Sequence, residues 1–230
     1  MLRPYTVELE HGRSVLLEAL DHFVDGVASL DDRDLMAASR CDGWRVADVI
    51  AHVHLGLQEM LLGLVNPTHA SPDTDAASYW TSAPPSTDSA ADDIDAMRFV
   101  QRLASAYQRP TGLVAHLRVT FDGVRRSVVA ADADAVSFQG KVLSTGDFLT
   151  TWAVELAVHW LDLGRELQLP DPPASALGVT RATVEALVGG ALPAGWSDTE
   201  AVLLATGRVP LDATQRADAE DLADVLPVLG

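Results

Sequence analysis

The sequence predicts a mainly α-helical protein, built as an antiparallel four-helix bundle with a small C-terminal α/β appendage. Three observations carry this prediction. Long segments repeat apolar residues at a helical period, which places those residues on one face of each helix. The first 168 residues show no run of alternating strands, as is typical of helices packed on helices. Residues 169–230 then change in character, with several prolines and glycines around a short apolar run.

The helices predicted before residue 170 follow from apolar periodicity and from local start and stop signals. They cover residues 6–30, 46–64, 89–108, 111–131 and 145–169. Pro110 separates the third segment from the fourth, and Ser144 with Asp147 supplies a start signal for the last. Prolines at 170, 172 and 173 stop that helix. The connection over residues 66–90 is rich in Pro, Ser, Thr, Asp and Ala, which predicts either a mobile flap or a plain linker.

The C-terminal part has a different pattern. We expect one helix over 174–190, a strand over 201–206 and a final short helix. A segment of this length is marginal for independent stability. The predicted domains are therefore a bundle over residues 1–168 and a small C-terminal domain, 169–230, packed on it.

Composition excludes several function classes. The formal net charge is −17 with a pI near 4.5, which opposes binding to nucleic-acid phosphates and to anionic membranes. A single cysteine, Cys41, rules out an intrachain disulfide and a thiolate metal cluster. The N-terminus lacks a hydrophobic signal region, and no apolar run approaches the roughly 20 residues that span a bilayer. These features predict a cytoplasmic protein, and they carry no information on its oligomeric state.

Glu155 and His159 are the most informative residues of the chain. They lie four residues apart in an apolar segment, so both side chains point to the helix face that also carries Phe148 and Trp152. A carboxylate among buried apolar groups is costly unless a charged partner compensates it. A divalent metal ion would remove that cost, whereas the simpler alternative is an ion pair at the edge of the core.

His52 is the best candidate for a third ligand, because bundles build internal metal sites from ligands on facing helices. Three protein ligands leave an open position, as in catalytic zinc sites. Asp162, three residues after His159, would hold a ligand histidine, or else it is a surface acid. Arg208 would clamp a substrate carboxylate, or else it is a solvated turn residue. Cys41 has no base suggested nearby in the sequence, and the simplest interpretation is a buried, inert thiol.

Two motifs give the chain a family resemblance. The stretch from Cys41 to Val53 includes Gly43-Trp44, Asp48 and His52, and the stretch from Glu155 to Leu163 includes His159 and Asp162. Both resemble motifs of the mycothiol-dependent maleylpyruvate isomerase family, within the DinB-like superfamily, in the same order and at a similar separation. Residues 205–211, which include Arg208, are similar to the short C-terminal domain of many members.

The resemblance implies a four-helix bundle that holds a divalent metal ion, usually zinc. It implies His52, Glu155 and His159 as metal ligands, Asp162 and Arg208 as residues involved in activity, and mycothiol as co-substrate. One departure is Arg45, which stands where the family commonly has a threonine or serine that caps the helix. We therefore expect the cap to come from elsewhere, with Asp42 as the candidate. No residue is assigned to thiol binding.

The leading hypothesis for function is a metal-dependent, mycothiol-using transferase or isomerase, in which a zinc-activated thiolate attacks a small electrophile. Maleylpyruvate cis–trans isomerisation is the narrower alternative. Two imidazoles and one carboxylate also suit non-haem iron or metal-bound hydroxide, so an oxygenase or hydrolase is a second alternative. A metal-stabilised binding protein without catalysis is the third.

Overall fold

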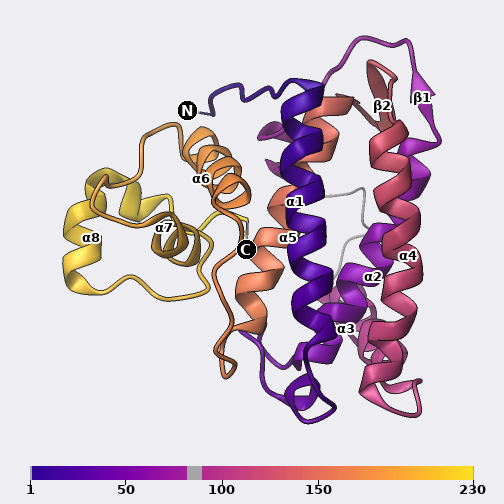
Figure 1. Cartoon of the computed structure of the whole chain (residues 1–230). Coiled ribbons are helices and arrows are strands. Elements are labelled where there is room, and N and C mark those ends of the chain that lie inside the picture. The colour runs from indigo at the N-terminus through magenta and orange to yellow at the C-terminus, as the bar shows by residue number, and fades with distance from the viewer. Residues whose placement is uncertain (1, 82–89, 230) are drawn as a thin grey trace.

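The computed structural model describes residues 2–81 and 90–229, without the side chains of 90–93. Four helices form the bundle: α1 (Leu9–Ala28), α2 (Val46–Leu64), α4 (Pro110–Ala130) and α5 (Thr145–Leu163). A further helix, α3 (Ala90–Ser105), packs beside α2 (Figure 1). The mainly helical class predicted from the sequence is confirmed. No helix in the described part of the chain is both long and apolar enough to cross a membrane.

The bundle consists of two parallel pairs that run in opposite directions. The N–H of Val7, just before α1, donates to the Asp147 carboxylate at the start of α5 at 2.7 Å, so α1 and α5 begin at the same end. The carbonyl oxygen of Asn66, shortly after α2, accepts from the N–H of Ser137, shortly after α4. The helices α2 and α4 therefore end close together, at the end of the bundle where α1 and α5 begin (Figure 1). The long connection through α3 brings the chain back between them, which a parallel pair requires.

A small sheet covers the end of the bundle where α5 begins. It contains β1 (Pro67–Thr68), β2 (Ala135–Phe138) and β3 (Lys141–Ser144) in the order β1-β2-β3, all antiparallel. The turn between β2 and β3 places Gln139 at φ 49° and Gly140 at φ 76°, and two such left-handed residues in succession are typical of a tight hairpin. This hairpin is not evident from the sequence, because Gln-Gly is a weaker turn signal than Asn-Gly.

The described part of the 66–90 connection is not a plain linker. The N–H groups of Asp73 and Thr74 both donate to the carbonyl oxygen of Val142, at 3.0 and 3.2 Å, and the N–H of Ala76 donates to Tyr5 at 3.1 Å. A short 3-10 helix, Ser78–Thr81, follows. Residues 66–81 are thus fixed on the sheet and on the N-terminal segment, and residues 82–89 of the predicted flap or linker lie outside the described residues.

The helix α5 is the central element of the protein. It packs between α1, α2 and α6 (Ala174–Val188), and every one of its residues except Glu155 is buried. Its start at the Ser144 N-cap is as predicted, because the Ser144 hydroxyl accepts from the N–H of Asp147 at 3.1 Å. Its predicted extension to residue 169 is wrong, because the helix ends at Leu163 with Gly164 as the C-cap.

The C-terminal region corrects the predicted α/β appendage. Its described regular elements are all helical: α6, α7 (Asp198–Ala205), α8 (Ala213–Ala219) and the 3-10 helix Glu220–Asp224. The strand expected over 201–206 is instead part of α7, which begins where the Ser197 hydroxyl accepts from the N–H of Glu200 at 3.2 Å. The division at residue 168 stays a prediction, since α6 gives Leu177 to the bundle core and Val184 to a second core cluster.

Gly146 is expected to be intolerant of even one added methyl group. A Cβ at this position would lie 2.0 Å from the carbonyl oxygen of Val7, a backbone atom that cannot rotate away. We expect Gly146→Ala to lower the free energy of unfolding by about 1–3 kcal/mol. Urea denaturation tests this, with Gly178→Ala as the control, because Gly178 is exposed inside α6 and a Cβ there meets nothing within 4 Å. Equal stability of the two variants would contradict the close approach of α1 and α5.

Candidate metal centre

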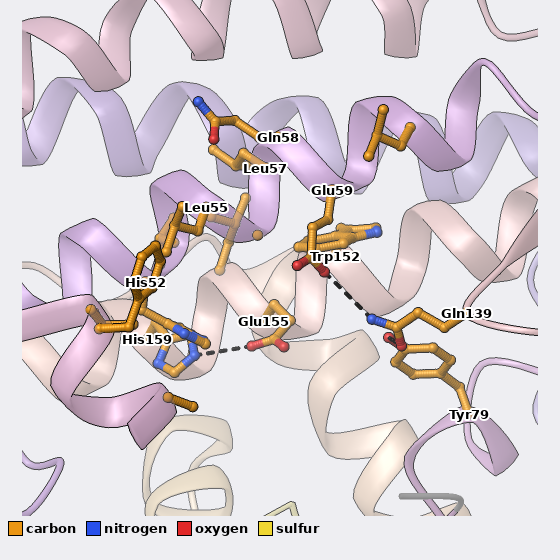
Figure 2. Close-up of a pocket in the computed structure, with 17 residues that line it drawn as sticks. His52, Leu55, Leu57, Gln58, Glu59, Tyr79, Gln139, Trp152, Glu155 and His159 are labelled. Atoms are coloured by element: carbon orange, nitrogen blue, oxygen red, sulfur yellow. Dashed lines mark hydrogen bonds and ion pairs between the residues drawn. The ribbon is translucent and has the colours of Figure 1, made fainter. Parts of the chain in front are cut away.

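Two helices bring together the three predicted ligands. His52 comes from α2, and Glu155 and His159 come from successive turns of α5. Their ligand atoms all lie within 4.8 Å of one another, and His159 Nε2 lies 3.0 Å from Glu155 Oε2. Figure 2 shows the two imidazoles beside one another at one end of a pocket, with the Glu155 carboxylate directed toward His159. Two neutral nitrogens and one carboxylate form a donor set that suits zinc or another divalent ion.

The position of His52 depends on how α2 begins. The Asp48 carboxylate accepts from the backbone N–H of Arg45 at 2.8 Å, so the acidic half of a capping box is present although Arg45 supplies no accepting side chain. The expectation that Asp42 caps this helix is wrong, because the side chain that accepts a hydrogen bond at its start is that of Asp48. His52 lies one turn further on. The centre of its ring is 5.6 Å from that of the Trp44 ring and 4.8 Å from that of the His159 ring, and both pairs meet edge to face.

Asp162 holds His159 from the side opposite to Glu155. Its carboxylate lies 3.0 Å from His159 Nδ1, and its side chain is 0% exposed, so it is not a surface acid. A carboxylate at Nδ1 fixes the ring and its tautomer, and it directs the Nε2 nitrogen toward Glu155 and His52. Asp162 does not line the pocket, so it is placed to orient His159 and not to touch a molecule bound there.

Arg208 contacts Asp162 directly, and its charge also helps to lower the pKa of Glu155, although Arg208 itself does not line the pocket. Its Nε donates to Asp162 at 3.2 Å, and its Nη1 donates to the carbonyl oxygens of Thr206 at 3.0 Å and Leu229 at 2.6 Å. The structure therefore gives Arg208 neither of its two predicted roles, since it is neither a solvated turn residue nor directed at a substrate carboxylate. It links the C-terminal region to the candidate metal centre through one buried carboxylate.

Cys41 corrects a further expectation. It is half-buried, and its sulfur forms a second group with His159 and Asp162 in which the ligand atoms also lie within 4.8 Å. The prediction that this thiol has no base nearby is therefore wrong. The contact depends on tertiary structure, which the sequence does not display. The loop before α2 folds back onto α5, where the N–H of Arg40 donates to the carbonyl oxygen of Asp162 at 2.8 Å.

Electrostatics set the protonation of the cluster. Burial lowers the pKa of His52 to about 4, and the charge of His159 acts in the same direction. Burial opposes charge on His159 too, but hydrogen bonds with Asp162, Cys41 and Glu155 outweigh it and raise its pKa well above the usual value. Burial alone would raise the pKa of Glu155, whereas the contact with His159 lowers it. Without metal at neutral pH, His52 is neutral and a His159 imidazolium lies between two carboxylates.

The three candidate ligands face a cavity of about 690 Å³ between α2, α3 and α5. Its walls are mostly apolar, and they include Leu57, Trp152 and Leu156. Tyr79, Gln139 and Glu59 lie at the other end (Figure 2), where the Tyr79 hydroxyl donates to Gln139 at 3.2 Å and Gln139 donates to Glu59 at 3.5 Å. Tyr79, Gln139 and Glu59 are not among the site residues that the sequence predicts.

The fold and this site define a class: a helix-bundle protein whose two histidines and one carboxylate converge beside an internal cavity. Residues 16–164 match the family model described as the mycothiol maleylpyruvate isomerase N-terminal domain. The chain therefore belongs to that family, as the two sequence motifs predict.

Two solved structures resemble the chain. One is the mycothiol-dependent maleylpyruvate isomerase, with a TM-score of 0.53 and 17% sequence identity, covering 77% of this chain and 70% of that chain. The other is a histidine-to-alanine mutant described under the same enzyme name, with a TM-score of 0.52, 16% identity and the same coverage. At this identity the likeness shows the fold alone. A search of curated proteins finds no significant match.

Proposed function

We propose that the protein is a metal-dependent, mycothiol-using transferase or isomerase. His52, Glu155 and His159 would hold a divalent ion, with zinc as the expected metal. The observation that carries the proposal is the convergence of these three donors at one end of a cavity large enough for small molecules. Neighbouring ligands of a tetrahedral ion lie about 3.3 Å apart at zinc–nitrogen bond lengths, close to the His159–Glu155 separation of 3.0 Å.

The chemistry needs an activated sulfur beside a bound electrophile. A divalent ion in this position would keep a thiol deprotonated at neutral pH, where a free thiol is mostly protonated. The chain contributes orientation and shielding: Asp162 fixes His159, and Trp152 and Leu156 keep water from the reacting atoms. With an alkyl or aryl halide, the sulfur–carbon bond forms and halide leaves with the bonding electrons. With an activated cis double bond, addition, rotation and elimination return the thiolate and give the trans isomer.

Thiol consumption is the direct test of this proposal. The purified protein, loaded with zinc and supplied with mycothiol, should consume thiol with monobromobimane or chlorodinitrobenzene faster than zinc alone or the metal-free protein. If metal binds stoichiometrically and thiol is never consumed, the transferase proposal fails and a non-catalytic binding protein is favoured. A coloured, oxygen-sensitive iron form with turnover that needs no thiol would favour an oxygenase instead.

Metal uptake at pH 7 should release about one proton for each ion bound. The raised pKa of His159 leaves its ring protonated, so the Nε2 proton must leave before that nitrogen can bind metal. His52, with a pKa of about 4, and Glu155, with a lowered pKa, have none to release. Affinity should therefore fall about tenfold for each pH unit below 7, and more steeply below about pH 4. Calorimetry in buffers of different ionisation enthalpy measures the number of protons released per ion bound. Zero release would contradict the assigned protonation of His159.

A further inference from the structure

We propose that the electrophile accepted by this site is uncharged and largely apolar, and that the cavity selects against carboxylate-bearing substrates. This inference rests on the proposed function, since it names the substrate class of the same site. It separates this chain's chemistry from that of an enzyme acting on a dicarboxylate such as maleylpyruvate.

The described lining of the cavity contains no lysine and no arginine. The lining residues are His52, Val53, Leu55, Gly56, Leu57, Gln58, Glu59, Leu62, Tyr79, Ala96, Phe99, Val100, Gln139, Trp152, Glu155, Leu156 and His159. The sequence between 82 and 93 has no lysine or arginine either, so that segment has no basic side chain to add. A substrate carboxylate in an apolar cavity needs a paired cation to offset its lost hydration.

The charges that do line the cavity are negative. Glu155 lies at the end with the candidate metal centre, and Glu59 lies at the opposite end. The charge of a divalent ion would be fully neutralised by Glu155 and one bound thiolate, so no positive charge would remain for a substrate carboxylate. A carboxylate anywhere in the cavity would therefore lie near at least one like charge.

Arg208 and Lys141 lie near this region, and both are already engaged. Arg208 is bound to the buried Asp162 and to two backbone carbonyls, and it does not reach the cavity. Lys141 lies with its ammonium 4.7 Å from the centre of the Tyr79 ring and donates to the Tyr79 carbonyl oxygen at 3.2 Å. Lys141 is not among the lining residues. Neither group is in place to pair with a substrate anion inside the cavity.

Apolar side chains are exposed where the cavity meets solvent. Leu62 of α2 is 66% exposed and Phe99 of α3 is 58% exposed, and both line the cavity. Exposed apolar residues that adjoin an apolar pocket are typical of sites that bind apolar ligands. The walls and the mouth of the cavity therefore favour the same ligand class.

A binding experiment tests the inference without any thiol transfer. Dinitrobenzene and dinitrobenzoate differ by one carboxylate, and both quench tryptophan fluorescence, which Trp152 reports from the cavity wall. We expect the zinc-loaded protein with mycothiol bound to bind dinitrobenzene at least about tenfold more tightly than dinitrobenzoate, because Glu155 and the thiolate then neutralise the charge of the ion. Glu59→Lys should narrow this ratio severalfold, because it replaces a like charge with an opposite one. Asp218→Lys makes the same charge change on the exposed surface of α8, and it should leave the ratio unchanged.

Dinitrobenzoate binding as tightly as dinitrobenzene, or equal effects of the two lysine variants, would overturn the inference. A second arm compares mycothiol transfer to chlorodinitrobenzene and to its carboxylate analogue, each corrected for the uncatalysed rate. The neutral compound should show the higher kcat/KM by a similar factor, and the reverse order would also overturn the inference. Selective binding without any transfer would instead refute the transferase part of the proposed function and leave the selectivity of the cavity established.

Discussion

His52→Ala and His159→Ala should each lower zinc affinity more than about 100-fold and abolish metal-dependent thiol consumption. Each substitution removes one of three protein ligands, and even changes behind a ligand typically cost about 10–100-fold in affinity. The two variants should differ in stability, since His159 lies 3.0 Å from both Glu155 and Asp162, whereas His52 makes ring contacts with Trp44 and His159. Metal content after dialysis against a weak chelator, measured by mass spectrometry, tests the expectation.

His69→Ala is the matched control, because His69 is exposed in the connection that follows β1. It should retain a full equivalent of zinc. Full retention by either His52→Ala or His159→Ala would mean that the assigned ligand set is wrong.

Asp162→Ala should lower the free energy of unfolding of the metal-free protein by about 3–5 kcal/mol, the usual cost of removing one partner from a buried charge pair. Asp162 is 0% exposed and binds both His159 and Arg208, whose side chains are 11% and 15% exposed, so two charged groups would lose their partner. Its pKa is lowered in the fold, mainly by these contacts acting against burial, so the stabilisation is present above 3.8, the ordinary pKa of the group. The difference from wild type should therefore shrink as the pH falls below that value.

Urea denaturation at pH 7 and at low pH measures this effect, with Asp21→Ala as the control. Asp21 pairs with Arg125 on the surface, where both side chains are about half exposed, and such pairs contribute less than about 1 kcal/mol. Asp162→Ala costing no more than Asp21→Ala would show that the buried network does not support the site. Asp162→Asn keeps an acceptor oxygen for His159 Nδ1 but removes the charge that faces both His159 and Arg208, so it tests the contribution of that charge alone.

The sequence predicted the elements whose signals are local. Glu155 and His159 share a helix face because four residues make about one turn, and His52 follows from the need for a facing helix. The start of α5 was visible in the Ser144 hydroxyl, and α2 was predicted at its observed bounds, Val46–Leu64. These features depend on helix periodicity and capping, which a single sequence displays.

The remaining features depend on contacts between distant segments. Tyr79 and Gln139 enter the cavity only because residues 66–81 fold onto the β2–β3 hairpin, and neither segment carries a signal for the other. Cys41 meets His159 only after the loop before α2 packs on α5. The misassigned strand has a different cause. The apolar run of residues 201–206 alone favours a strand, whereas the Ser197 hydroxyl accepts from the N–H of Glu200 and begins a helix there.

The central claim is that His52, Glu155 and His159 bind one divalent ion. The zinc X-ray absorption spectrum of the protein with one equivalent of zinc and no added thiol tests it most directly. Coordination by His52, Glu155 and His159 predicts two imidazole nitrogens and one carboxylate oxygen at about 2.0–2.2 Å, with no sulfur in the first shell. A sulfur at about 2.3 Å would place the ion on the alternative group of Cys41, His159 and Asp162. That result, or a spectrum with fewer than two imidazoles, would contradict the account.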